Sequence, residues 1–122
     1  MRVVFPEAGI EVAVELETSP LSEKIQKGLP VSARVDTWGK EIYFEIPVRS
    51  DIVNPQETVR PGDVAYWPQG ACLCFFFGAT PASRTPDEIR PASPVEVIGR
   101  IKGDVKILET IPSGTRVEVY DQ

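Results

Sequence analysis

The sequence predicts a mainly β protein in which eight strands close into a barrel, with two short helices near its ends. Three observations support this prediction. Apolar and polar residues alternate with a period of two along short runs, as in strands that bury one face. Turn sequences such as EAG, DTWG and PQG separate these runs. The length of 122 residues is that of one domain, 1–122, without an internal repeat or a linker.

The first half of the chain supplies four strand candidates. The runs RVVF and IEVAVEL, at 2–5 and 10–16, form a predicted hairpin around the EAG turn. A third strand is expected over 31–35, where Val31, Ala33 and Val35 alternate with polar residues. After the turn DTWG, the run EIYFEIPV at 41–48 places Ile42, Phe44 and Ile46 on one face and Tyr43 and Glu45 on the other.

A helix is predicted between the second and third strands, in the segment TSPLSEKIQKGLP. Ser19 suits the capping position, and Pro20 suits the first helical position. Leu21 and Ile25, four residues apart, give a narrow apolar stripe. Gly28 is expected to end the helix in the left-handed conformation.

The second half supplies the other four strands. These are DVAYW at 63–67, ACLCFFF at 71–77, SPVEVIGRI at 93–101 and TRVEVYD at 115–121. The second of them is apolar on both faces, which is typical of a strand covered on both sides. Proline-rich segments at 49–62 and 78–92 read as loops. A short helix is expected within 103–114, capped by Asp104 and closed by Gly114. Closing eight strands into a barrel removes exposed sheet edges, and an open two-sheet sandwich is the competing arrangement.

Composition excludes several classes of function. The net charge of −5 argues against nucleic acid as a partner, because phosphate binding needs a basic face. No run of residues is long and apolar enough to span a membrane, and the N-terminal MRVVFPEAG is too short for a signal peptide. We therefore expect a cytoplasmic, unprocessed protein. The absence of histidine excludes histidine-based nucleophile systems and histidine zinc sites in this chain.

The two cysteines are predicted to be structural. Cys72 and Cys74 are two residues apart on one strand, so their side chains share a face. A closed zinc site needs four ligands, and the chain has no third cysteine and no histidine. A disulfide between these neighbours has poor geometry on a regular strand. We expect two small core side chains in a reducing compartment, with no metal and no cofactor.

The aromatic residues provide the candidate binding site. Tyr66 and Trp67 are adjacent, so one of them points away from whatever the other packs against, and Trp38 lies beside Gly39 in a turn. A wall of such rings beside a proline-rich loop suits a peptide or small-molecule ligand. The predicted ligand-binding set is Trp38, Tyr43, Phe44, Tyr66, Trp67, Phe76 and Arg90, with no catalytic residue among them.

Three longer motifs carry a family resemblance. The segments DTWGKEIYFEIPV, GDVAYWPQGACLCFFFGATPAS and RPASPVEVIGRI resemble those of small, uncharacterised prokaryotic proteins with a cyclophilin-like fold. The resemblance extends over most of the chain and implies a closed eight-stranded barrel with two helices. True cyclophilins isomerise X-Pro bonds with an arginine on an F-H-R-x-x-P strand. The nearest match here is IYFEIP, Ile42 to Pro47, where Phe44 takes the arginine position and Tyr43 the histidine position.

Three functions follow as hypotheses. The first is a non-catalytic domain that binds a peptide, a proline-containing segment or a small ligand at an aromatic-lined groove. The second is a peptidyl-prolyl isomerase of weak or atypical activity, with its arginine supplied by Arg49, Arg84 or Arg90. The third is an interaction protein whose aromatic surface forms a homo-oligomer interface.

Overall fold

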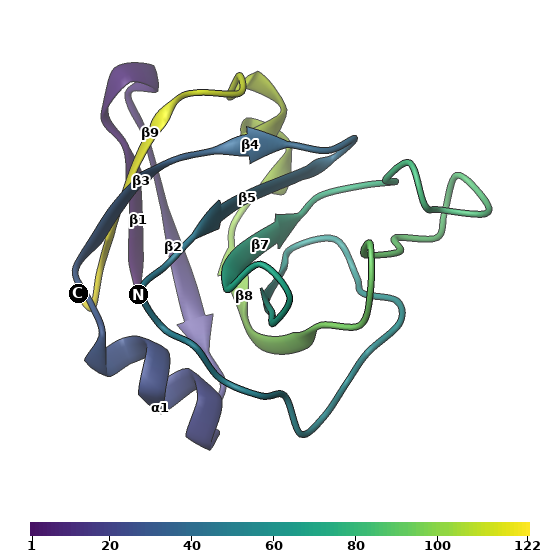
Figure 1. Ribbon diagram of the computed structural model, residues 1–122. Coiled ribbons are helices and arrows are strands. Elements are labelled where there is room, and N and C mark those ends of the chain that lie inside the picture. The colour runs from purple at the N-terminus through teal and green to yellow at the C-terminus, as the bar shows by residue number, and fades with distance from the viewer.

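A single antiparallel sheet forms the body of the protein. The computed structural model describes residues 1–122, and Figure 1 shows the sheet curling into a nearly closed barrel. The strands are β1 (Arg2–Phe5), β2 (Ile10–Leu16), β3 (Val31–Arg34), β4 (Asp36–Thr37), β5 (Glu41–Glu45), β6 (Asp63–Trp67), β7 (Cys72–Phe76), β8 (Glu96–Lys102) and β9 (Arg116–Tyr120). Their order in the sheet is β3-β9-β1-β2-β8-β6-β7-β5-β4. The predicted mainly β barrel is therefore confirmed.

The barrel has nine strands where the sequence predicted eight. The predicted strand 31–35 and the following turn form one extended segment that changes partner at Val35, so that β3 pairs with β9 and β4 pairs with β5. The N–H of Val35 donates to the carbonyl of Thr115 at 2.9 Å, which attaches the point of partner exchange to the residue just before β9. Residues 31–37 thereby join the two ends of the sheet, and Asp36–Thr37, predicted as part of a turn, is a short strand.

The barrel interior is filled by one apolar cluster of 22 buried residues. The inward face of each strand contributes, for example Val3 and Phe5 from β1 and Leu73 and Phe75 from β7. The rings of Phe44 and Phe75 meet edge to face, with centroids 5.7 Å apart. Side chains rather than a cavity therefore occupy the centre, as expected for a barrel of this size.

The α-helix α1 (Pro20–Lys27) lies across one end of the barrel (Figure 1). Leu21 and Ile25 are buried in the barrel core, and the Oγ of Ser19 accepts a hydrogen bond from the N–H of Ser22 at 3.1 Å. The cap and the apolar stripe are as predicted. Gly28 is not left-handed, since its φ is −84°; a Cβ there would lie 2.9 Å from Val48, so packing explains the glycine.

Two 3-10 helices complete the barrel. The first, η1 (Pro6–Ala8), replaces the turn predicted between the strands of the first hairpin. The second, η2 (Val105–Thr110), is the helix predicted within 103–114: Asp104 accepts from the N–H of Lys106, and Leu108 is buried. The helix ends at Thr110, so Gly114 belongs instead to the turn before β9. None of these helices is long and apolar enough to cross a membrane.

A second apolar layer covers the outer face of β6, β7 and β8. Its eight buried residues are Val59, Ala65, Cys72, Cys74, Phe76, Ile89, Val95 and Val97. The cover is the irregular chain 78–95, which is tied to the other long loop by the pairs Gln56–Val95 and Val59–Ile89. All five residues of β7 are buried, which confirms the prediction that this strand is covered on both faces. The pocket described next lies at the margin of this layer.

Candidate functional site

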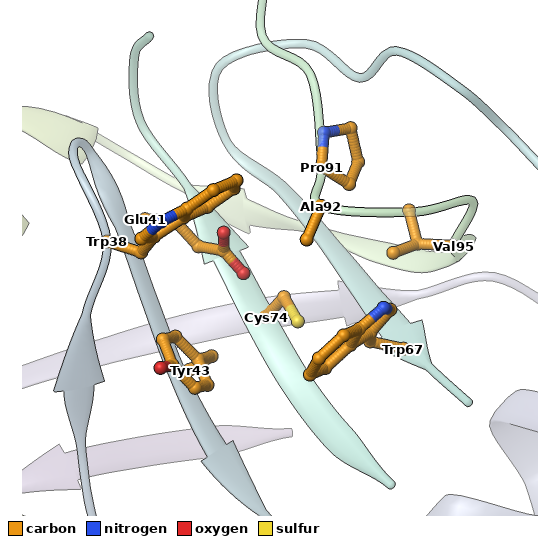
Figure 2. Close-up of a pocket in the computed structure, with 8 residues that line it drawn as sticks. All are labelled: Trp38, Glu41, Tyr43, Trp67, Cys74, Pro91, Ala92 and Val95. Carbon is orange, nitrogen blue, oxygen red and sulfur yellow. The ribbon is translucent and has the colours of Figure 1, made fainter. Parts of the chain in front are cut away.

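An apolar pocket of about 250 Å³ opens on the outer face of the barrel, between the sheet and the chain 91–95 (Figure 2). Strands contribute Glu41 and Tyr43 from β5, Trp67 from β6 and Cys74 from β7, whereas loops contribute Trp38, Pro91, Ala92 and Val95. Two tryptophan rings and a tyrosine ring therefore surround a single carboxyl group. Both tryptophans of the chain are in this wall.

Strand register explains why the hollow forms at this place. Glu41 and Tyr43 point outward because their neighbours Ile42 and Phe44 fill the barrel. Cys74 lies directly between Tyr43 on β5 and Ala65 on β6. Because the Cys74 thiol and the Ala65 methyl group are small, they leave a depression in the sheet surface between the larger rings of Tyr43 and Trp67. Figure 2 shows the Cys74 sulfur at the floor of this space.

Both tryptophans are anchored by hydrogen bonds to neighbouring residues. The indole Nε1–H of Trp67 donates to the Oγ of Ser93 at 2.6 Å, which fixes one edge of the ring. The backbone N–H of Trp38 donates to the carbonyl of Glu41 at 3.0 Å within the turn between β4 and β5. The first bond orients the Trp67 ring, and the second fixes the backbone from which the Trp38 ring projects.

The turn of Trp38 is also anchored by the long loop. Gly39 has a φ of +59°, and a Cβ there would lie 2.9 Å from the backbone of Ala79 and Thr80. The N–H of Lys40 donates to the carbonyl of Ala79 at 2.9 Å. Only glycine permits both this backbone conformation and this close approach. The loop thus sets the position of Trp38 relative to the sheet.

Glu41 is the electrostatic centre of the pocket. Its side chain is 6% exposed, and no lysine or arginine lines the pocket with it. Burial raises the pKa of Glu41 from 4.5 to about 7, against a smaller lowering by a hydrogen bond from the Cys74 thiol. The carboxyl group therefore changes its charge near neutral pH. A buried titrating group in a concave site is a common feature of binding and catalytic sites.

The surroundings of Glu41 are electrically negative. Burial raises the pKa of the Tyr43 hydroxyl, and the charges of Asp36 and Glu41 raise it further. Burial also raises the pKa of Cys72 to about 11 and that of Cys74 well above its usual value, again with a contribution from Glu41. Both thiols are therefore protonated at neutral pH and are poor nucleophiles. Neither cysteine forms a disulfide, and no group of three or more His, Cys, Asp or Glu side chains is arranged to hold a metal ion.

The predicted site residues fall into two groups. Trp38, Tyr43 and Trp67 line the pocket and are half-exposed. The other four do not line it. Phe44 and Tyr66 are fully buried inside the barrel, because strand alternation turns them away from the outward Tyr43 and Trp67. Their inclusion in a ligand-binding wall is therefore corrected.

Phe76 and Arg90 do not line the pocket, and each has a structural contact elsewhere. Phe76 is fully buried in the outer apolar layer, beneath the long loop. The Nε of Arg90 donates to Glu88 at 3.0 Å, and the neighbouring Pro91, not Arg90, lines the pocket. Tyr66 also has a structural role, since its hydroxyl donates to the carbonyl of Val48 at 2.7 Å and accepts from the N–H of Ser50.

Glu41 is not among the site residues predicted from the sequence, although the sequence contains a signal for it. Glu41 precedes Tyr43 by two residues, so a strand places both on one face. The outward position of Tyr43 thus implied a carboxyl group beside it. Cys74 was expected to be a core residue, and it is buried, but it also forms part of the pocket floor. No comparable signal marked Pro91, Ala92 or Val95, which come from irregular chain.

Comparison with known proteins places the chain in a family. The model of the family described as cyclophilin-like matches residues 1–120. The solution structure of the hypothetical protein AF2241 from Archaeoglobus fulgidus is similar, with a TM-score of 0.78 and 39% sequence identity. That match covers 99% of this chain and 92% of the archaeal one. No match is found among curated protein sequences. A family match over almost the whole chain, on a barrel of this topology, shows that the protein belongs to the cyclophilin-like family.

Proposed function

We propose that this protein is a binding domain whose outer pocket holds a small molecule or one side chain of a peptide without covalent chemistry. One observation carries the proposal. Trp38, Tyr43 and Trp67 come from three separate segments, remain half-exposed, and surround an existing hollow with a buried carboxyl group at its side. Aromatic walls with one or two placed polar groups are typical of small-ligand sites.

Peptidyl-prolyl isomerisation receives less support from the geometry. Its electrostatic step in true cyclophilins needs an arginine at the bound amide, and no arginine lines the pocket. Arg49 pairs with Glu45 at 3.2 Å, and Arg84 and Arg90 both pair with Glu88. Phe44, at the aligned arginine position, faces the barrel interior. In a coupled X-Pro assay we expect the uncatalysed rate; a faster rate that disappears in Arg90→Ala would favour the isomerase instead.

The binding proposal can be tested without a labelled ligand. Because Trp38 and Trp67 are the only tryptophans, two indole N–H signals in an NMR spectrum report on the pocket alone. We expect saturable shifts of both signals with members of a panel of small amines, alcohols, acids and proline-containing peptides. Ala92→Leu should fill the pocket and abolish the shifts, whereas Ala8→Leu, at an exposed alanine outside the pocket, should preserve them. Unchanged indole signals across the whole panel would refute the proposal.

A further inference from the structure

We propose that the ligand of this pocket is an alkylammonium cation, whose N–H groups meet the Glu41 carboxylate while its carbon chain lies against the aromatic rings. This inference rests on the proposed function and names the chemical class of the ligand. Figure 2 shows the Glu41 carboxylate directed into the space that Trp38, Tyr43 and Trp67 surround.

The first support is a buried negative charge that has no positive partner in the protein. Glu41 is only 6% exposed. Apart from Tyr43 and Cys74, no other residue of the lining is ionisable. No lysine or arginine is close enough to contribute to its pKa. Buried carboxylates normally have a cation or several hydrogen-bond donors beside them. The pocket leaves that position open to a ligand.

The second support is that every titratable group facing Glu41 is acidic or neutral. Burial and the charges of Asp36 on β4 and of Glu41 raise the pKa of Tyr43 on β5. Glu41 also contributes to the raised pKa values of Cys72 and Cys74 on β7. Trp67 of β6 and the residues of chain 91–95 in the lining carry no charge. None of these elements supplies a positive charge, so the field at the pocket favours cations and opposes anions.

The third support is the aromatic wall. The faces of tryptophan and tyrosine rings carry partial negative charge, and they attract ammonium groups most strongly where water is excluded. Two tryptophans and one tyrosine around one carboxylate combine this attraction with an ion pair. The carboxylate accepts hydrogen bonds from N–H donors, which favours an ammonium that retains protons over a quaternary one.

A neutral apolar ligand fits the observations less well. It would occupy the apolar part of the wall and cover Glu41 without giving the carboxylate a partner, which opposes binding wherever Glu41 is ionised. A pocket of about 250 Å³ is also too small for a folded segment, so the bound group is a small amine or the end of a lysine side chain. These two sources share the same alkylammonium chemistry.

The experiment compares matched probes by the indole signals at pH 8. The probes are n-butylammonium, n-butanol, butyrate, tetramethylammonium and N-acetyl-lysine methylamide. We expect n-butylammonium to bind at least about tenfold more tightly than n-butanol, the size of one charge-assisted hydrogen bond, and butyrate not to bind. Tetramethylammonium should bind more weakly than n-butylammonium. Relative affinities of n-butylammonium and the lysine derivative distinguish a free amine from a peptide side chain.

A matched pair of variants locates the charge that matters. Glu41→Gln keeps the shape of the side chain and should weaken n-butylammonium binding by about tenfold or more, with n-butanol binding unchanged or improved. Glu45→Gln, on the same face of β5 but exposed, should leave both affinities within about twofold. At pH 5.5, where Glu41 is protonated, wild type should lose most of its preference for the cation.

The outcomes separate this inference from the proposed function. Indole shifts with n-butanol equal to those with n-butylammonium, in wild type at pH 8, would overturn the cation inference and leave the binding function standing. An unaltered preference for the cation in Glu41→Gln would overturn it as well. Unshifted indole signals with every probe would refute both proposals.

Discussion

Replacing Glu41 by glutamine is expected to stabilise the protein at alkaline pH and to change little in acid. The pKa of Glu41 is raised from 4.5 to about 7 by burial, so the folded protein holds this proton more tightly than the unfolded chain does. The stabilisation from protonation is therefore fully present below about pH 4.5 and is lost as pH rises through 7. Glutamine, which stays neutral, does not incur this loss.

The magnitude follows from the two pKa values. At about 1.4 kcal/mol for each tenfold change in proton affinity, a rise from 4.5 to about 7 corresponds to about 3 kcal/mol. The difference in unfolding free energy between Glu41→Gln and wild type should thus grow by about 3 kcal/mol between pH 4.5 and pH 8. Comparing the two proteins at each pH cancels the titration of all other groups.

Urea unfolding followed by far-ultraviolet circular dichroism measures this difference, because tryptophan fluorescence would report on the pocket itself. Glu45→Gln is the control, since it makes the same chemical change at an exposed carboxyl group on the same strand. An equal free-energy difference for Glu41→Gln at pH 4.5 and pH 8 would show that Glu41 is not a buried carboxyl group without a positive partner.

Three further predictions concern the frame around the pocket. Tyr66→Phe should lower the unfolding free energy by about 1–3 kcal/mol, because a buried carbonyl and an N–H lose their partner; Tyr43→Phe, on the outer face, should have a much smaller effect in the same urea titration. Gly39→Ala should cost at least about 1 kcal/mol more than Gly9→Ala, because both glycines have left-handed backbone but only the first is in close contact, and equal losses would contradict this. At pH 8 neither Cys72 nor Cys74 should react with Ellman's reagent until denaturant is added. Burial raises the pKa of Cys72 to about 11 and that of Cys74 well above its usual value, so both remain protonated thiols. Rapid reaction of the folded protein would contradict this prediction.

Local alternation was enough to predict most of the barrel. In β2 and β5, apolar residues at every second position specify both the strand and its inward face. The division of 31–37 into two strands was not predictable in this way. Its cause is the placement of Val35 against the turn before β9, a contact between residues 80 positions apart in the sequence.

The candidate site was predicted only in part, for a related reason. A strand pattern shows that Tyr66 and Trp67 face opposite ways, but it does not show which of them faces the core. That choice depends on the pairing of β6 with β7 and β8. The loop residues of the pocket depend on contacts such as Gln56 with Val95, which leave no periodic signal in the sequence.

The extended segment 31–37 connects the two ends of the sheet and so closes the barrel. It is bound to β9 through four residue pairs and to β5 through two, and its release would uncover both of those strands together. Each uncovered strand would then offer unpaired N–H and C=O groups to another molecule. Detachment of these seven residues would therefore turn a self-contained domain into a template for strand exchange between copies, and the two pairs beside Trp38 form its shorter attachment.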